Sequence, residues 1–230
     1  MRICGLQKLS MVDYPGKLAA TIFTGGCNLR CPFCHNAPLV IGAEEASILS
    51  EGEVLDFLSS RKGLLDGVVL SGGEPLLQPD AADFLRELRS LGFSIKLDTN
   101  GCYPERLRSI LKESLVDYVA MDLKNAPGKY AQTVGVKNFD LSSVEESIRI
   151  LKTGCIDYEF RTTVVQELHT LDDILSLAKW AQGAPRYFLQ HFVDSGNLIG
   201  QGLHEVPAAE MQAMLQVAKP FFGEVLLRGV

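Results

Sequence analysis

Residues 18–36 read LAATIFTGGCNLRCPFCHN, an apolar run that leads into a loop with three cysteines. The run 18–24 predicts a buried strand. The loop after it places Cys27, Cys31 and Cys34 very close together in the chain. A disulfide framework would spread its cysteines through a short secreted chain, so this cluster favours a metal or redox centre in a reducing compartment.

The rest of the chain alternates similar apolar runs with amphipathic segments. We expect further strands at 67–71, 93–98, 116–123, 158–165 and 186–192. We expect helices at 51–63, 80–92, 104–115, 142–154, 171–183 and 207–220. Ser50 is a candidate N-cap, and Ser143 with Glu146 has the spacing of a capping box.

Strands that alternate with helices predict βαβ units and a parallel sheet in an α/β protein. The predicted strand ends recur about every 33 residues, the size of one βαβ unit. Eight such units would need roughly 265 residues, whereas the chain has 230. Six units fit, either as an open doubly wound sheet or as a partial barrel, and in both the chemistry gathers at the carboxyl ends of the strands.

Composition and charge limit the classes of function. Hydrophobic residues make up 47% of the chain and charged residues 22%, which is typical of a globular protein. A net charge of −6 argues against a nucleic-acid surface. The sequence shows neither a secretion signal nor an apolar run long enough for a membrane helix. We therefore expect a single cytoplasmic domain over residues 1–230, with no nucleic-acid or membrane partner.

Polar residues follow every predicted strand. The six strand ends carry TGGCNLRCPFCHN, SGGEP, DTNG, MDLK, RTT and QHF. Loops are often polar, so any one of these ends is weak evidence. Their coincidence at all six ends indicates a site for a polar ligand.

Several kinds of centre could use three clustered thiols. A structural zinc site needs a fourth ligand, and His35 lies next to Cys34, whereas a typical site takes its second ligand pair from farther along the chain. The segment CPFCH matches the haem attachment pattern, which normally requires export. Cys31 and Cys34 have the spacing of a thioredoxin-like redox pair, a reading that leaves Cys27 unexplained. For Cys4, Cys102 and Cys155 we expect buried packing.

A cubane iron–sulfur cluster usually takes four thiolates, so three thiolates leave one iron with an open position. The segment CNLRCPFC, with GGEP at 72–75, resembles the radical S-adenosylmethionine superfamily. The longer stretch CNLRCPFCHN, preceded by DYPGKLAATIFTGG, is similar to the glycyl-radical-enzyme activases. The similarity is greatest to anaerobic ribonucleoside-triphosphate reductase activating proteins, with pyruvate formate-lyase activating enzymes as near relatives. It runs from Gly5 to residue 192 and implies a (β/α)6 partial TIM barrel.

This resemblance implies a set of site residues. Cys27, Cys31 and Cys34 would hold a 4Fe–4S cluster whose fourth iron binds the amine and carboxylate of S-adenosylmethionine. Glycines and a carboxylate would hold the methionyl ammonium, an aromatic ring (alternatively ordinary loop packing) would lie near the adenine, and cationic side chains would face the carboxylate and ribose edge. These and the other implied cofactor-binding residues are Phe33, Gly72, Gly73, Glu74, Asp98, Thr99, Asn100, Asp122, Lys124, Arg161 and His191.

The resemblance also implies a monovalent cation held by Asp98, Thr99 and Asp122. Two carboxylates that converge on the carboxylate of a ligand repel one another strongly at low dielectric. A cation beside them would relieve this repulsion.

The implied reaction is reductive cleavage of S-adenosylmethionine to a 5′-deoxyadenosyl radical, which abstracts hydrogen from a glycine of a partner enzyme. We expect that partner to be an anaerobic ribonucleotide reductase, with reduced flavodoxin or ferredoxin as electron donor. Alternatives are activation of another glycyl-radical enzyme such as pyruvate formate-lyase, and radical chemistry on a small molecule, as in 7-carboxy-7-deazaguanine synthases. A binding protein without enzymatic activity would require the strand-end residues to be coincidental.

Overall fold

The computed structural model describes residues 1–42 and 48–229. The chain forms two compact units. Unit 1 consists of Met1–Asn28 and Pro38–Ala120, and unit 2 consists of Leu29–Ala37 and Met121–Val230. A single domain over residues 1–230 stays a prediction.

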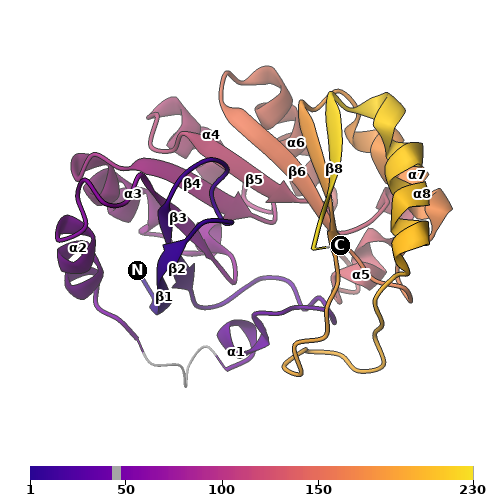
Figure 1. Ribbon diagram of the computed structural model, residues 1–230, viewed down its shortest axis with the longest axis horizontal. Helices are drawn as coiled ribbons and strands as arrows, with labels where there is room; N and C mark the ends of the chain where they lie inside the picture. Colours follow the sequence, from indigo (N-terminus) through magenta and orange to yellow (C-terminus); the bar gives the residue numbers. More distant parts are fainter. Residues whose placement is uncertain (43–47, 230) are drawn as a thin grey trace. The chain divides into compact units, whose positions relative to one another are not determined.

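Helices and strands alternate along most of the chain (Figure 1). In order, the elements are β1 (Ile3–Ser10), β2 (Ala19–Thr24), α1 (Ala37–Val40), α2 (Glu51–Ser59), β3 (Gly67–Gly72), η1 (Pro75–Leu77), α3 (Ala81–Ser90), β4 (Ser94–Thr99), α4 (Pro104–Lys112), β5 (Tyr118–Asp122), η2 (Pro127–Lys129), α5 (Tyr130–Thr133), α6 (Ser142–Thr153), β6 (Asp157–Val164), α7 (Leu171–Ala181), β7 (Arg186–His191), α8 (Ala208–Ala218), η3 (Lys219–Phe221) and β8 (Glu224–Arg228).

The strands follow one another in the sheet in the order β1-β2-β3-β4-β5-β6-β7-β8. In unit 1, β1 pairs with β2 antiparallel, and β2, β3 and β4 pair in parallel. In unit 2, β6, β7 and β8 pair in parallel. A doubly wound sheet reverses its strand order at a switch point, whereas a barrel keeps sequence order. The order therefore confirms the partial-barrel prediction, and among the described strands β1 and β8 are its two open ends.

The six predicted strands correspond to β2 through β7, so those predictions are confirmed. The sequence interpretation missed β1 and β8. Both are only partly buried, and in β8 Val225 is the one buried residue. Edge strands that are only partly buried lack the continuous apolar run that marks a central strand. An ion pair to a buried carboxylate anchors β8 instead: the half-buried Arg228 guanidinium donates to both carboxylate oxygens of Glu159, at 2.7 and 3.0 Å.

Helix starts agree with the sequence at α2 but not at α6. Ser50 caps α2 in a full capping box with Glu53, as the N-cap prediction requires. Helix α6 begins at Ser142, one residue before the predicted cap, and Leu141 in the N-cap position makes no side-chain cap. The capping box predicted at Ser143 is therefore wrong. The Ser142 N–H donates to the Asp140 carboxylate at 3.0 Å, so the preceding aspartate satisfies this donor.

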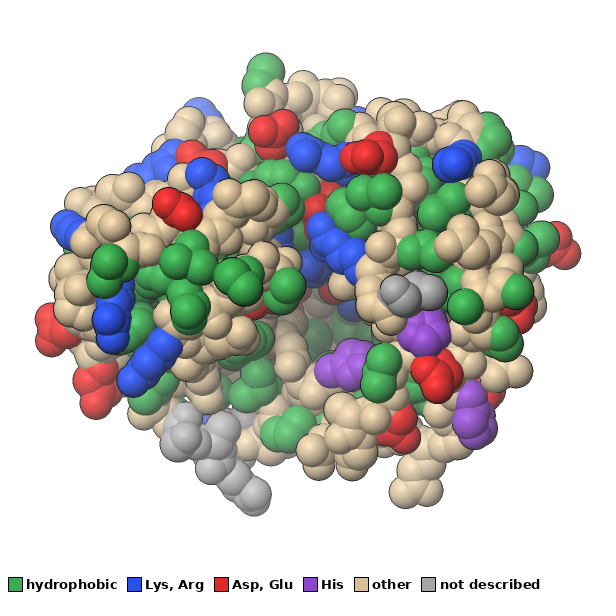
Figure 2. Space-filling view, viewed as in Figure 1, with side chains coloured by type: hydrophobic (Ala, Val, Ile, Leu, Met, Phe, Trp, Pro, Cys, Tyr) green, Lys and Arg blue, Asp and Glu red, His purple; other side chains and the backbone are tan. Residues whose placement is uncertain are grey.

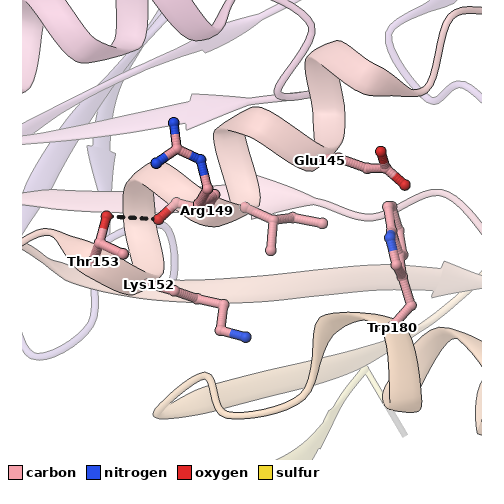
Figure 3. Close-up of a pocket in the computed structure, with 6 residues that line it drawn as sticks. Glu145, Arg149, Lys152, Thr153 and Trp180 are labelled. Carbon is pink, nitrogen blue, oxygen red and sulfur yellow. Dashed lines mark hydrogen bonds between the residues drawn. The ribbon is translucent and has the colours of Figure 1, made fainter.

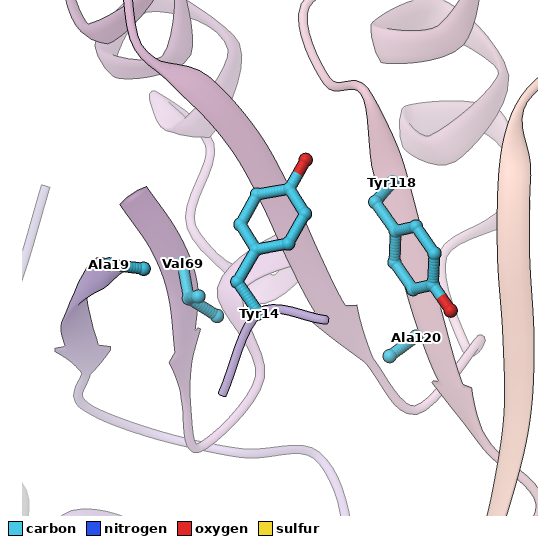
Figure 4. Packing of buried hydrophobic residues seen from close by; sticks show 5 residues of the cluster. All are labelled: Tyr14, Ala19, Val69, Tyr118 and Ala120. Atoms are coloured by element: carbon cyan, nitrogen blue, oxygen red, sulfur yellow. The ribbon is translucent and has the colours of Figure 1, made fainter. Parts of the chain in front are cut away.

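Two tyrosines lie at the centre of one core cluster in unit 1 (Figure 4). The rings of Tyr14 and Tyr118 lie 6.0 Å apart and pack with three small or branched residues, Ala19, Val69 and Ala120. In unit 2, α7 and α8 pack against each other (Figure 1). None of the helices in the described part of the chain is both long and apolar enough to cross a membrane.

Candidate functional site

In unit 1, the loop after β3 packs directly on the segment that enters the cysteine loop. The N–H of Gly73 donates to the Thr24 carbonyl at 2.9 Å, and that of Glu74 donates to the Gly26 carbonyl at 2.9 Å. A Cβ added at Gly73 would lie 2.0 Å from the Gly26 oxygen, and one at Gly72, where φ is +123°, would lie 2.2 Å from the Thr24 nitrogen. These glycines are therefore required by the close approach of two backbone segments of the chain itself.

Glu74 is 1% exposed, and its carboxylate accepts three hydrogen bonds from the chain. One oxygen accepts from the Leu76 N–H at 3.0 Å and the Thr99 hydroxyl at 2.8 Å. The other oxygen accepts from the Asn100 N–H at 2.7 Å. Glu74 thus ties the SGGEP loop to the end of β4, so it fixes the position of the loop whatever else it binds.

The end of β4 also reaches Cys27. The side-chain amide of Asn100 lies 3.7 Å from the Cys27 sulfur and donates to Asn28 at 2.9 Å. The Asn100 side-chain oxygen accepts the Cys102 N–H at 3.0 Å. Unit 1 therefore brings together Cys27, Asn100, Thr99 and Glu74. The sequence interpretation did not single out Asn28, although its position next to a predicted ligand is a usable signal.

Asp98 has a cationic partner in its own strand. The Lys96 ammonium is 1% exposed and donates to one Asp98 oxygen at 2.5 Å, while the Ser71 hydroxyl donates to the other oxygen at 3.0 Å. Side chains two residues apart in a strand share a face, which explains the contact. Lys96 compensates the charge of Asp98, so repulsion between this carboxylate and a ligand carboxylate is no longer a reason to expect a bound cation. The monovalent cation site stays a prediction.

In unit 2, Asp122 at the end of β5, Lys124 just after it and Arg161 within β6 form a charged group. One Asp122 oxygen accepts from the Arg161 Nε at 2.8 Å and the other accepts from the Lys124 ammonium at 2.9 Å. Burial works to raise the pKa of Asp122, but Arg161 and Lys124 outweigh it and hold that pKa well below its usual range. Burial likewise opposes the charge of Lys124, yet Asp122 and Cys31 raise its pKa. Two cations and one anion leave one positive charge here.

Cys31 and Cys34 lie together in unit 2, where the Cys34 N–H donates to the Cys31 carbonyl at 3.1 Å. Burial raises the pKa of the Cys34 thiol, and the nearby Lys124 partly offsets this effect. Cys27 belongs to unit 1. Among the described residues, no group of three or more His, Cys, Asp or Glu side chains is placed to hold a metal ion. Convergence of the three thiols therefore stays a prediction.

All six cysteines of the chain are described, and none of them is in a disulfide. Cys4 and Cys102 are half-buried, and Cys155 is exposed. The expectation of buried packing is therefore wrong for Cys155, which lies in the turn between α6 and β6. A lone cysteine in a turn carries no apolar pattern that would have revealed its exposure.

Phe33 is 3% exposed and packs against a histidine that the sequence interpretation did not select. Its ring meets the ring of His169 edge-on, with centroids 6.4 Å apart. The His169 Nδ1 accepts the Val165 N–H at 3.0 Å, so its Nε2 carries the proton donated to the Lys124 carbonyl at 2.8 Å. Burial lowers the pKa of His169, in keeping with this neutral form. His169 therefore holds the backbone of Lys124.

His191 is held by the segment that follows β7. Its Nε2 lies 2.9 Å from the Val206 carbonyl, and its Nδ1 lies 3.7 Å from the Glu205 carboxylate. Histidine side chains reach the surface on the face drawn in Figure 2, whereas His169 is 2% exposed. Both of these His191 contacts are with its own chain, and its predicted role beside the adenine or ribose stays a prediction.

A separate pocket of about 350 Å³ lies between α6 and α7 (Figure 3). It is lined by Glu145, Ile148, Arg149, Lys152, Thr153 and Trp180. None of the residues predicted for the site lines this pocket.

Comparison with known proteins places these features in a family. A family model described as the radical SAM superfamily matches residues 21–182. A protein of Methanocaldococcus jannaschii named as a glycyl-radical enzyme activating enzyme is 31% identical over 236 residues, 99% of this chain and 96% of that protein. A pyruvate formate-lyase-activating enzyme of Clostridium pasteurianum is 35% identical over 131 residues, 54% of this chain and 52% of that protein.

The solved structure of Streptococcus suis SuiB bound to S-adenosylmethionine shares the fold. Its TM-score is 0.71 at 14% identity, and the match covers 89% of this chain and 48% of that chain. The family match includes the cysteine loop after β2, the SGGEP loop after β3 and the charged group of unit 2. The chain therefore belongs to the radical S-adenosylmethionine superfamily, within its group of glycyl-radical enzyme activating enzymes.

Proposed function

We propose that this enzyme activates an anaerobic ribonucleoside-triphosphate reductase by removing a hydrogen atom from the Cα of one glycine of that partner. The cysteine loop carries the proposal. Its three cysteines, Cys27, Cys31 and Cys34, are not in disulfides, and they follow β2 in a chain that is similar over 99% of its length to a protein named as an activating enzyme.

Radical S-adenosylmethionine enzymes use a 4Fe–4S cluster together with S-adenosylmethionine. The donor set of this chain fits that cluster, because thiolates are the preferred ligands of iron–sulfur centres and three of them leave one iron open. Cys27, Cys31 and Cys34 would hold it. When bound, the cluster supplies one electron, and S-adenosylmethionine supplies the 5′-deoxyadenosyl radical that takes the hydrogen atom.

The charged group of unit 2 would bind the anionic end of S-adenosylmethionine. Lys124 and Arg161 together outweigh Asp122 by one positive charge, which suits a carboxylate. Asp122 holds both cations by direct hydrogen bonds, so their positions are set before a ligand arrives. The Nε of Arg161 donates to Asp122, and the planar guanidinium is a group that suits the carboxylate or the ribose edge of the ligand.

The SGGEP loop would bind the methionyl ammonium. Because a Cβ at Gly72 or Gly73 would collide with the chain itself, the ligand would meet backbone carbonyls of this loop rather than a space left by missing side chains. The carboxylate of Glu74, which belongs to this loop, is buried, and a negative charge there would favour a cation nearby. Thr99 and Asn100 keep that carboxylate in place.

The remaining predicted residues complete the proposed pocket. Phe33, held by His169, would give an apolar wall beside the adenine, and His191 would lie near the adenine or ribose.

Reduced flavodoxin or ferredoxin would deliver the electron. A pyruvate formate-lyase is the second candidate partner, and the 35% identity to an activating enzyme of that class favours it.

An anaerobic activation assay separates these partners. The protein is reconstituted with iron and sulfide, reduced, and incubated with S-adenosylmethionine and either an anaerobic ribonucleotide reductase or a pyruvate formate-lyase. We expect a glycyl-radical doublet in the paramagnetic resonance spectrum of the reductase. A doublet with pyruvate formate-lyase alone would assign the second partner, and none with either would favour a small-molecule substrate.

Matched cysteine variants test the assignment of the ligands. Cys31→Ser should lose the cluster, whereas Cys155→Ser, a change at an exposed turn, should retain it. About four irons and four sulfides per chain are expected for the wild type. Full iron content in Cys31→Ser would refute the ligand assignment, and one zinc in colourless wild type would refute the proposed function.

A further inference from the structure

Two segments that are remote in sequence press on the cysteine loop within unit 2. The first follows α5. The Arg30 N–H donates to the Val134 carbonyl at 2.9 Å. A Cβ added at the next residue, Gly135, would lie 2.4 Å from the Arg30 carbonyl oxygen. The φ of Gly135 is +68°, so both the space and the backbone conformation require glycine here.

The second contact comes from the segment between β7 and α8. The N–H of Gly200 donates to the Pro32 carbonyl at 2.7 Å. A Cβ added at Gly200 would lie 2.6 Å from the Pro32 Cβ and 3.2 Å from its Cα. No left-handed φ is involved at this position, so the requirement for glycine comes from the close approach alone.

The segment that carries Gly200 is itself fixed beyond the glycine. Glu205 forms a β-bridge with Val165, and the Gln166 N–H donates to the His204 carbonyl at 3.0 Å. At its start, the segment leaves β7 beside His191, whose ring lies against the Val206 carbonyl. Gly200 therefore meets Pro32 from a segment that is attached to the ends of β6 and β7, and it cannot move away freely.

We propose that Gly135 and Gly200 are positioning residues that hold the backbone on either side of Cys31 in the conformation needed for cluster binding. The inference rests on the proposed function, because it takes Cys31 as a cluster ligand. Arg30 and Pro32 flank Cys31 directly, and each has a hydrogen bond and a close glycine contact. A side chain at either glycine pushes on the backbone next to the ligand.

The test measures cluster retention in four glycine-to-alanine variants. Gly200→Ala is matched by Gly128→Ala, where a Cβ meets nothing within 4 Å and φ is not left-handed. Gly135→Ala is matched by Gly196→Ala, where φ is +77° and a Cβ again meets nothing within 4 Å. Each protein is reconstituted anaerobically without a partner, and the rate at which a chelator removes iron is followed by absorbance.

We expect the cluster to be lost roughly tenfold faster in Gly200→Ala and Gly135→Ala than in their matched controls, the factor expected when overpacking costs about 1.4 kcal/mol. The apo proteins should unfold at similar urea concentrations. Pro32→Gly removes the Cβ that the methyl group added by Gly200→Ala would meet. The double variant Gly200→Ala with Pro32→Gly should therefore retain iron longer than Gly200→Ala alone.

Equal iron-loss rates in Gly200→Ala and Gly128→Ala would overturn the proposal. Unfolding of the apo Gly200→Ala variant, or no recovery in the double variant, would also count against it, because the contact would then serve the fold rather than the loop. Failure of wild-type protein to bind iron would instead refute the proposed function, so the two failures are distinguishable.

Discussion

In unit 1 the polar side chains at the strand ends bind the chain itself, whereas in unit 2 they form a charged group with positive charge left over. Glu74 is surrounded by two backbone N–H groups and a hydroxyl, and Asp98 is neutralised by Lys96. Asp122 has two cationic partners, Lys124 and Arg161. The same residue type thus fixes a loop in one unit and holds two cationic side chains in the other.

Because the carboxylates of the two units have different partners, substitutions in the two units should affect different properties of the protein. A buried carboxylate with three donors is costly to disturb, because each donor left without an acceptor costs about 1–3 kcal/mol. A charged group beside a ligand contributes more to binding than to folding. We therefore expect unit 1 variants to lose stability and unit 2 variants to lose affinity for S-adenosylmethionine.

The largest effect is expected from Gly73→Ala in unit 1. The new Cβ would lie 2.0 Å from a backbone oxygen of Gly26, which cannot turn aside as a side chain would. The free energy of unfolding measured in urea should fall by at least about 3 kcal/mol. Gly52→Ala in α2, where a Cβ meets nothing within 4 Å, is the control and should gain about 0.5–1 kcal/mol. A loss below about 1 kcal/mol at Gly73 would contradict the packing argument.

In unit 2, Arg161→Ala should weaken S-adenosylmethionine binding by roughly ten- to a hundredfold, because hydrogen bonds to charged groups contribute about 1.5–3 kcal/mol. Equilibrium dialysis with the reconstituted protein measures the change in Kd. Arg149→Ala, which removes an exposed arginine of α6, should leave Kd unchanged. Unchanged affinity in Arg161→Ala would remove the charged group from the proposed pocket.

The pH dependence of stability tests whether neutral His169 supports the backbone of Lys124. Burial lowers the pKa of His169 in the folded protein, so the unfolded chain binds the extra proton first as the pH falls. Stability from neutral His169 is present above about pH 6.5 and is lost below it, by at most about 1.4 kcal/mol per pH unit. His169→Gln, measured in urea from pH 7.5 to 5, should show a shallower slope. Parallel slopes in the two proteins would contradict the assignment.

The smallest expected effect is on the free energy of unfolding, for substitutions at the starts of two helices, one in each unit. Ser50→Ala removes the cap of α2 and should cost about 1 kcal/mol. Ser143→Ala lies inside α6, where no cap is lost, and should change stability by less than about 0.5 kcal/mol. Urea unfolding of the two variants is the measurement. A larger cost at Ser143 would restore the capping box that the sequence predicted there.

Much of the fold could be predicted because central strands are continuous apolar runs. The strands β2 to β7 were found in this way, and their spacing gave the six-unit barrel. The edge strands β1 and β8 could not be found, since partial burial removes the apolar signal. The cap of α6 was predicted at Ser143 instead of Leu141 because Asp140 satisfies the first donor, a contact that the capping pattern does not include.

The site residues were chosen from strand ends and a family resemblance, and both methods overlook supporting groups. Lys96 could have been noticed, because it interrupts an apolar strand two residues before Asp98 and so shares its face. His169 could not, since nothing in the local sequence links it to Lys124, which is far away in the chain. The predicted cofactor-binding role of Gly72 and Gly73 stays a prediction, and nothing in the local sequence shows that another backbone segment of the chain packs against them.

The order of the chain gives the contacts of Gly135 and Gly200 a consequence for biosynthesis. The cysteine triplet leaves the ribosome early, whereas the two residues that press on its backbone are made much later. A nascent chain that ends before Gly200 exposes the thiols without the Pro32 contact, and one that ends before Gly135 lacks both supports. On the proposed function, the cysteine loop therefore has both of its supports for cluster binding only after Gly200 has been made.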